Sequence, residues 1–131
     1  MTDPYRDLLL HAYEEELDAS SFYMSLSSSA PTPLCQNLFW SAANDEYRHA
    51  QMLAVLLSAT AWPGSVAVPS TAIGKDDLEK AIQGELEAIC DYAKLASLAH
   101  SEHDRLVFLS ILGDEYGHVR IFLALQSTGC V

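Results

Sequence analysis

The chain has 131 residues, of which half are hydrophobic and 19% are charged. This indicates one globular domain spanning residues 1–131 and excludes a disordered or collagen-like chain. Seven Lys and Arg against eighteen Asp and Glu give a formal net charge of -11. The sequence therefore offers no basic face for nucleic acid or for an anionic membrane surface.

Prolines and glycines interrupt the chain at few places, and the segments between them are rich in Leu, Ala, Glu and Met. Their lengths and periodicity predict helices at 5–29, 33–60, 76–100 and 103–127. Asp3 or Thr2 is expected to cap the first helix, and Asp76 or Asp77 the third.

The connections between these segments predict how the helices are arranged. Short turns follow the first and third predicted helices, which makes two antiparallel hairpins. Residues 61–75 join the hairpins and can reach about 45 Å at roughly 3.3 Å per extended residue. The sequence therefore predicts an all-α fold, an antiparallel four-helix bundle made of two helical hairpins joined by a long crossover connection.

The N-terminal segment and the cysteines bear on cellular location. Residues 1–16 alternate charges with short apolar runs and show no secretory signal, and no apolar run is long enough to span a membrane. The three cysteines are odd in number and contain no C-x-x-C pair. We therefore expect reduced thiols, with Cys35 and Cys90 as packing residues, and a cytoplasmic protein.

An internal repeat relates the two halves of the chain. Residues 45–49 read Asp-Glu-Tyr-Arg-His and residues 114–118 read Asp-Glu-Tyr-Gly-His, which is an offset of 69 positions. The same offset relates two Glu-x-x-Ala-x-x-x-Tyr motifs, which begin at Glu16 and at Glu85. In each half the two repeated glutamates stand 30 residues apart, symmetrically about the predicted turn, so they are expected to meet side by side.

Each repeated glutamate lies on the apolar face of its predicted helix, so four carboxylates and two imidazoles converge on one core. These candidate ligands are Glu16, Glu46, His49, Glu85, Glu115 and His118. Buried carboxylates repel one another, and of the seven cationic side chains only Arg48 lies close to the repeated motif. Two divalent metal ions would balance four carboxylates.

The pattern of ligand types points to a particular kind of metal site. Glu and His at positions i and i+3 lie on one helix face and can reach the same ion. One Glu from each of two helices, with Glu-x-x-His from each of the other two, is the ligand set of carboxylate-bridged di-iron and di-manganese bundles. The absence of a thiolate ligand favours iron or manganese over structural zinc.

The doubled Glu-x-x-His, the doubled Glu-x-x-Ala-x-x-x-Tyr and the long connection resemble the rubrerythrin-type di-iron domain of the ferritin-like superfamily. The resemblance covers essentially the whole chain. It implies a ferritin-like bundle in which the six residues bind two Fe ions, or Mn ions, with Glu46 and Glu115 as the bridging carboxylates.

The same resemblance assigns roles around the metal ligands. Asp45 and Asp114 match the family's acids that hold the histidine ring of the opposite hairpin. Arg48 completes the motif in the first half, whereas Gly117 replaces the arginine in the second, which predicts a looser surrounding there.

The chain departs from the family pattern in two ways. Full rubrerythrins also carry a rubredoxin iron domain, for which this chain has no C-x-x-C, so the electron donor is expected to be a separate protein such as a rubredoxin. Ala88 stands where rubrerythrins typically carry an extra glutamate, which argues against redox switching of a ligand.

Two interpretations stay open for Tyr23 and Tyr92, which either fill the core or also donate a hydrogen bond to a ligand carboxylate and supply protons.

The leading functional hypothesis is an oxidoreductase, most simply a homodimer, that reduces hydrogen peroxide or dioxygen and protects against oxidative stress. The alternative is an iron-binding storage protein with ferroxidase activity, which the lack of a fifth helix after residue 126 weakens. A metal-free structural domain is disfavoured because all six ligand positions are intact. Catalase chemistry and hydroxylation of an organic substrate stay open, and the sequence identifies no substrate pocket.

Overall fold

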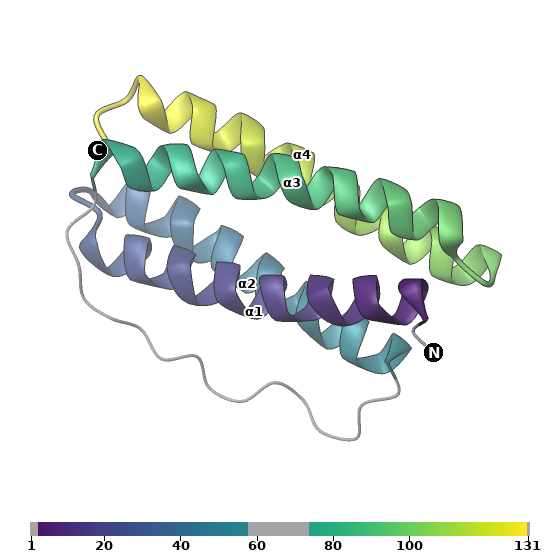
Figure 1. Cartoon of the computed structure of the whole chain (residues 1–131). Coiled ribbons are helices and arrows are strands. Elements are labelled where there is room, and N and C mark those ends of the chain that lie inside the picture. The colour runs from purple at the N-terminus through teal and green to yellow at the C-terminus, as the bar shows by residue number, and fades with distance from the viewer. Residues whose placement is uncertain (1–2, 58–73, 131) are drawn as a thin grey trace.

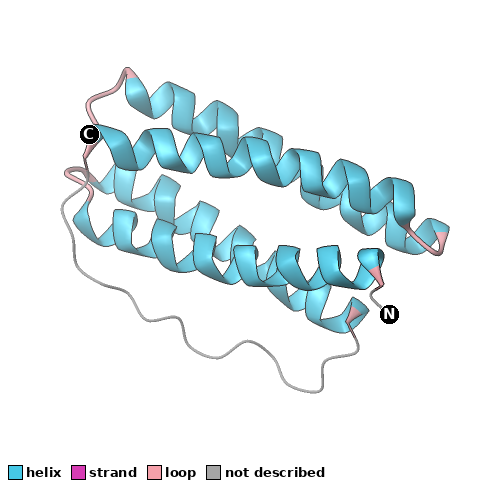
Figure 2. Ribbon diagram, in the orientation of Figure 1, coloured by secondary structure: helices cyan, strands magenta, loops and turns pink. Residues whose placement is uncertain are grey.

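The computed structural model describes residues 3–57 and 74–130. The described part consists of the helices α1 (Pro4–Ser29), α2 (Pro33–Leu56), α3 (Lys75–Leu98) and α4 (Glu102–Gln126), which form a bundle (Figures 1 and 2). The predicted all-α fold is confirmed. The predicted extension of the second helix over residues 58–60 lies outside the described residues.

Short polar side chains start three of the helices. Asp3, Thr32 and Ser101 have extended backbone and accept a hydrogen bond from backbone N–H groups two or three residues further on. These bonds satisfy donors that have no partner within the helix. Pro4 and Pro33 follow the first two caps, at the position where proline costs no hydrogen bond.

The start of α3 differs from the prediction that Asp76 or Asp77 is the cap residue. The cap is Gly74, because the helix begins one residue earlier than predicted, at Lys75. Asp77 therefore lies in the first turn, and its Oδ2 accepts a hydrogen bond from the Gly74 N–H at 3.0 Å. The first helix is capped by Asp3, and Thr2 lies outside the described residues.

The helices pair as two antiparallel hairpins. α1 packs along α2 and α3 along α4, and the hairpins meet through contacts of α1 with α3 and of α2 with α4. α2 ends at the opposite end of the bundle from the start of α3, as the predicted crossover requires (Figure 1). The repeat of 69 positions relates α1 to α3 and α2 to α4.

Two apolar clusters occupy the two ends of the bundle. One contains Tyr23, Leu26, Phe39, Leu78 and Phe122, and the other contains Leu53, Tyr92, Leu95, Phe108 and Ile111. Burying each large side chain contributes about 1.5–3 kcal/mol to stability. Along every helix a buried glutamate falls between the two clusters. None of the described helices is both long and apolar enough to cross a membrane.

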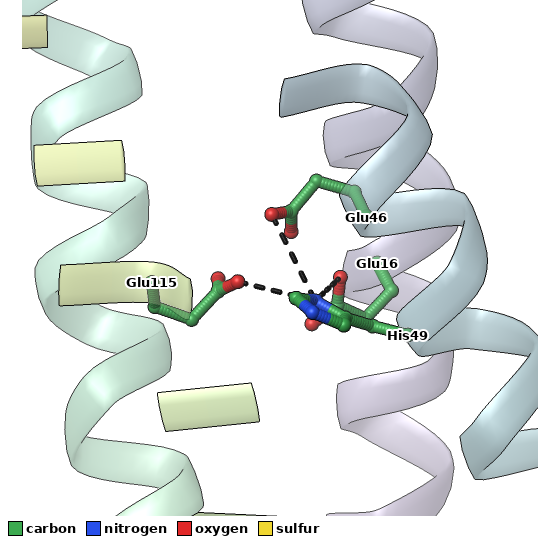
Figure 3. Close-up of side chains that lie close together, drawn as sticks. All are labelled: Glu16, Glu46, His49 and Glu115. Atoms are coloured by element: carbon green, nitrogen blue, oxygen red, sulfur yellow. Dashed lines mark ion pairs between the residues drawn. The ribbon is translucent and has the colours of Figure 1, made fainter. Parts of the chain in front are cut away.

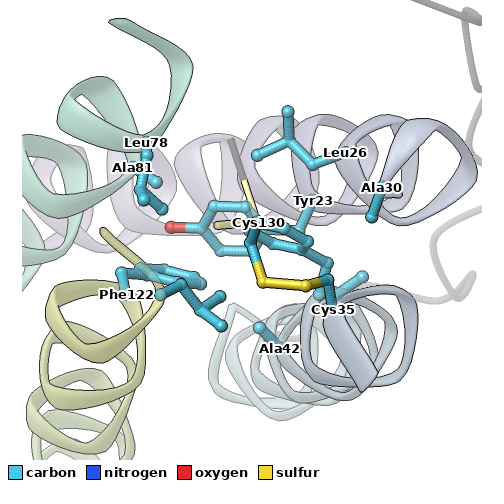
Figure 4. Close-up of a cluster of buried hydrophobic side chains, with 12 residues drawn as sticks. Tyr23, Leu26, Ala30, Cys35, Ala42, Leu78, Ala81, Phe122 and Cys130 are labelled. Carbon is cyan, nitrogen blue, oxygen red and sulfur yellow. A yellow bond between two sulfur atoms is a disulfide. The ribbon is translucent and has the colours of Figure 1, made fainter. Parts of the chain in front are cut away.

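A disulfide joins Cys35, near the start of α2, to Cys130, after the end of α4 (Figure 4). The expectation of reduced thiols, with Cys35 only a packing residue, is therefore wrong. The fold brings together two cysteines 95 positions apart in sequence, with their Cα atoms 5.8 Å apart. Cys90 is free, and it is exposed rather than packed. Disulfides persist in oxidising compartments, so the cytoplasmic prediction loses the support it drew from the cysteines.

Reducing this disulfide should lower the free energy of unfolding by about 3–5 kcal/mol, because the bond closes a long loop in the unfolded chain. Urea unfolding with and without a thiol reductant measures the effect. The matched control is the double variant Cys35→Ser, Cys130→Ser, whose transition should not respond to the reductant. An unchanged wild-type midpoint would contradict the stabilising role.

Candidate metal centre

The structure brings the six predicted ligand residues together at mid-height of the bundle. Each helix supplies one glutamate, and α2 and α4 each add a histidine one turn later. Their side chains are all buried. Their ligand atoms form two overlapping groups in which all atoms lie within 4.8 Å of one another: Glu16, Glu46, His49 and Glu115, and Glu46, Glu85, Glu115 and His118.

In the first group the ring of His49 faces three carboxylates (Figure 3). Its Nδ1 lies 3.2 Å from Glu115 Oε1 and 3.4 Å from Glu16 Oε2. Glu46 Oε1 is 3.9 Å from the same nitrogen. A cation between these atoms would therefore be held by three helices.

The second group repeats this arrangement around His118. Its Nδ1 lies 2.8 Å from Glu46 Oε1 and 3.3 Å from Glu85 Oε1. Glu115 Oε1 is 3.8 Å from the same nitrogen. Glu46 and Glu115 thus belong to both groups, so each could serve two ions at once.

The outer nitrogen of each histidine meets an aspartate from the other half of the chain. His49 Nε2 lies 2.8 Å from Asp114 Oδ2, and His118 Nε2 lies 2.9 Å from Asp45 Oδ2. With Nδ1 facing the glutamates, Nε2–H is the donor in both bonds. Such a bond fixes the tautomer and the ring orientation of a metal-binding histidine.

The two aspartates that bind the histidines differ in their own contacts and in their exposure. Arg48 Nη2 lies 2.7 Å from Asp45 Oδ1, and the Asp45 side chain is 27% exposed. In the second half Gly117 has no side chain to offer, and the Asp114 side chain is 44% exposed. The outer support of the centre is therefore asymmetric.

Two buried tyrosines also link the halves. The Tyr23 hydroxyl donates to Glu85 Oε1 at 2.6 Å, and the Tyr92 hydroxyl donates to Glu16 Oε1 at 2.5 Å. Both rings also belong to the apolar clusters, so each tyrosine fills the core and also bonds a candidate ligand. Each phenol is a proton donor already bonded to a candidate ligand.

Burial sets the electrostatics of the carboxylates in the chain without metal ions. It raises the pKa of Glu46 well above its ordinary value, and repulsion from Glu16 and Glu115 raises it further. Burial also raises the pKa of Glu85 to about 8, although a hydrogen bond with His118 opposes the shift. These carboxyl groups therefore retain protons unless a cation replaces them.

The carboxylate charges also raise the pKa of both histidines, whereas burial acts on them in the opposite sense. Burial lowers the pKa of His49, but the adjacent carboxylates of Glu115 and Glu16 outweigh it and raise the pKa to about 11. For His118 the bond with Glu85 outweighs burial and raises the pKa to about 9. Two glutamates and both histidines of the centre thus hold protons more tightly than they would in water.

The donor set fits two divalent cations. Buried atoms without a hydrogen-bond partner include Glu16 Oε2, Glu46 Oε1, His49 Nδ1, Glu85 Oε2 and Glu115 Oε1. Unpartnered buried polar atoms are costly, so their convergence indicates ligands awaiting an ion. Carboxylate oxygens with imidazole nitrogens suit iron or manganese.

A four-helix bundle with a buried carboxylate and histidine centre of this type belongs to the class of ferritin-like di-metal proteins. A family model described as Rubrerythrin matches residues 7–126. The chain therefore belongs to the rubrerythrin family, as its motifs predicted.

Two further proteins resemble the chain. The hypothetical protein Pfu-1136390-001 from Pyrococcus furiosus has the same fold, with a TM-score of 0.76 and 23% identity over 92% of this chain and 86% of that one. The uncharacterized protein YhjR of Bacillus subtilis (strain 168) is 49% identical over 52 residues, which are 40% of this chain and 36% of that protein. The matched segment thus spans about a third of YhjR.

No substrate pocket could be identified from the sequence, but the structure shows a cavity beside the candidate metal centre. A cavity of about 230 Å³ opens between α1 and α3 and reaches down to the four glutamates. Its walls include alanines and Gly84, and residues of these types do not by themselves predict a cavity. The usable signal was the position of Ala19 and Ala88, one turn after the glutamates of α1 and α3.

Proposed function

We propose that the chain is a di-metal oxidoreductase that reduces hydrogen peroxide or dioxygen. The observation that supports this best is the pair of ligand groups that share Glu46 and Glu115, next to two phenolic protons. Two iron or manganese ions held there would supply the two electrons that breaking an O–O bond consumes. Reduction of one peroxide also takes up two protons and yields two waters.

Side chains around the centre supply protons and orient the histidines. Tyr23 and Tyr92 hold a proton on the phenolic oxygen, which stays protonated because burial raises the pKa of both phenols. Asp45 and Asp114 orient the histidines through their Nε2 atoms. The apolar clusters close off the centre towards the two ends of the bundle.

The proposal includes partners for the reaction. Electrons come from a separate donor protein such as a rubredoxin, and the chain acts as a homodimer. A cytoplasmic location would require the Cys35–Cys130 disulfide to persist in a reducing compartment, and cell fractionation with an antibody against the chain tests it.

The experiment that tests the function measures metal content, assembly and turnover together. We expect two metal ions per chain, a small oligomer in size-exclusion chromatography, and faster reoxidation of the diferrous protein by hydrogen peroxide than by dioxygen. Saturation at one ion would contradict the binuclear centre. A large assembly that retains many irons per chain would favour iron storage instead.

A further inference from the structure

The cavity between α1 and α3 lies on the axis that relates the two halves. Its eighteen lining residues form nine pairs, each 69 positions apart in sequence. The four glutamates of the metal centre are two of these pairs and lie at the bottom of the cavity. Glu16 Oε2 and Glu85 Oε2 are buried and have no hydrogen-bond partner. The cavity is therefore built over both metal positions at once.

Small apolar side chains keep this space open. Ala19 and Ala88 follow the α1 and α3 glutamates by three positions and stand on the same helix faces, half-buried in the cavity wall. Ala12, Ala81 and Phe22 extend the apolar wall. An apolar cavity of about 150 Å³ holds a molecule the size of benzene. At about 230 Å³ this cavity has more room than hydrogen peroxide or dioxygen requires.

The charges at the mouth disfavour an anionic occupant. Four acidic residues, Glu15, Asp18, Glu87 and Asp91, line the cavity against one lysine, Lys80. The His11 Nε2 from α1 lies 3.8 Å from Asp91 Oδ2 of α3, at the mouth. This arrangement repels anions, and it leaves an apolar wall to contact an uncharged organic group.

We propose that the cavity binds small, neutral alkyl hydroperoxides and that Ala19 and Ala88 determine this specificity. The alkyl group lies against the two alanines and Phe22, and the O–O group points to the metal centre. This inference rests on the proposed function. One hydroperoxide, two electrons from the two divalent ions and two protons give one alcohol and one water. The O–O bond breaks and two O–H bonds form, and the phenols of Tyr23 and Tyr92, which donate to Glu85 and Glu16, are available as proton donors.

The first test observes binding without redox chemistry. Protein loaded with zinc, which cannot supply electrons, carries ¹³C-labelled alanine methyl groups and is titrated with tert-butyl hydroperoxide. The Ala19 and Ala88 methyl signals are expected to shift with saturation, while that of Ala93, exposed on the same helix as Ala88, stays in place. Methyl signals at the cavity that do not respond would overturn the inference.

The second test compares two oxidants on the iron-loaded protein. Ala88→Leu and, separately, Ala19→Leu fill the cavity without adding a ligand atom. Each is expected to lower the ratio of the rate constant for tert-butyl hydroperoxide to that for hydrogen peroxide at least tenfold. Ala93→Leu adds the same side chain outside the cavity and should leave the ratio unchanged. Metal analysis verifies that each variant holds two ions per chain.

The outcomes separate this inference from the proposed function. Wild-type protein that reduces hydrogen peroxide but not tert-butyl hydroperoxide overturns the inference alone. The same holds for variants whose two rate constants fall by equal factors. Loaded wild-type protein that reduces neither peroxide overturns the proposed function, whatever the methyl signals show.

Discussion

Replacing Glu46 or Glu115 with alanine is expected to remove both metal ions from the protein. Each of these glutamates belongs to both ligand groups, so its loss takes a ligand from each ion. His49→Ala or His118→Ala should weaken mainly one ion, because each histidine belongs to a single group. Metal analysis after dialysis against a weak chelator measures both effects.

An exposed carboxylate on α3 provides the control for this series. Glu87→Ala removes one negative charge near the centre without removing a candidate ligand, and it should retain two ions. Equal losses from the two glutamate and the two histidine variants would contradict the bridging roles of Glu46 and Glu115. Circular dichroism shows whether each variant is still helical.

Metal-free protein is expected to unfold at a higher temperature at about pH 5.5 than at about pH 7.5. Folding raises the pKa of Glu85 to about 8, of His118 to about 9 and of His49 to about 11, and it also raises that of Glu46. The folded chain thus binds more protons than the unfolded chain. Stability from a raised pKa is complete below the unfolded value and is lost as the pH rises towards the folded value.

The size of this effect follows from the number of protons retained. Each proton that the folded state keeps and the unfolded state loses changes stability by about 1.4 kcal/mol per pH unit. Glu85 makes stability depend on pH between its ordinary pKa and a pH of about 8. The histidines do so at pH values above their ordinary pKa. In loaded protein the metal ions replace these protons, so the trend should be smaller or reversed.

A matched variant separates the effect of the buried cluster from that of the acidic surface. The control is needed because both make the folded protein less stable as the pH rises. Glu16→Gln with Glu85→Gln keeps the surface charges and removes two buried carboxylates. Its melting temperature should fall less between the two pH values than that of metal-free wild type. Identical slopes for the two proteins would mean that the buried cluster does not titrate as one unit.

The position of the four glutamates in the core could be predicted from the sequence. Helical periodicity placed each glutamate on an apolar face, and equal spacing about each turn placed Glu16 beside Glu46 and Glu85 beside Glu115. The hydrogen bonds of Tyr23 to Glu85 and of Tyr92 to Glu16 run between the hairpins, so the spacing within one hairpin could not reveal them. They depend on how the hairpins dock.

The disulfide and the cavity were decided by the tertiary structure in the same way. Cys35 and Cys130 are 95 positions apart and meet only because the end of α4 docks beside the start of α2. An odd number of cysteines without a spacing motif carries no information on such a pair. The cavity forms where α1 and α3 face each other across small side chains, which are common on any helix.

The sequence by itself determined the helices, their pairing into hairpins and the residues of the candidate metal centre. The reason is that helical periodicity and a repeat of 69 positions can be read from the order of the residues alone. Only the tertiary structure decided which phenol bonds which glutamate, which cysteines pair, and what space stands open over the centre. Those features depend on distances between residues of different hairpins, which packing sets and sequence spacing does not encode.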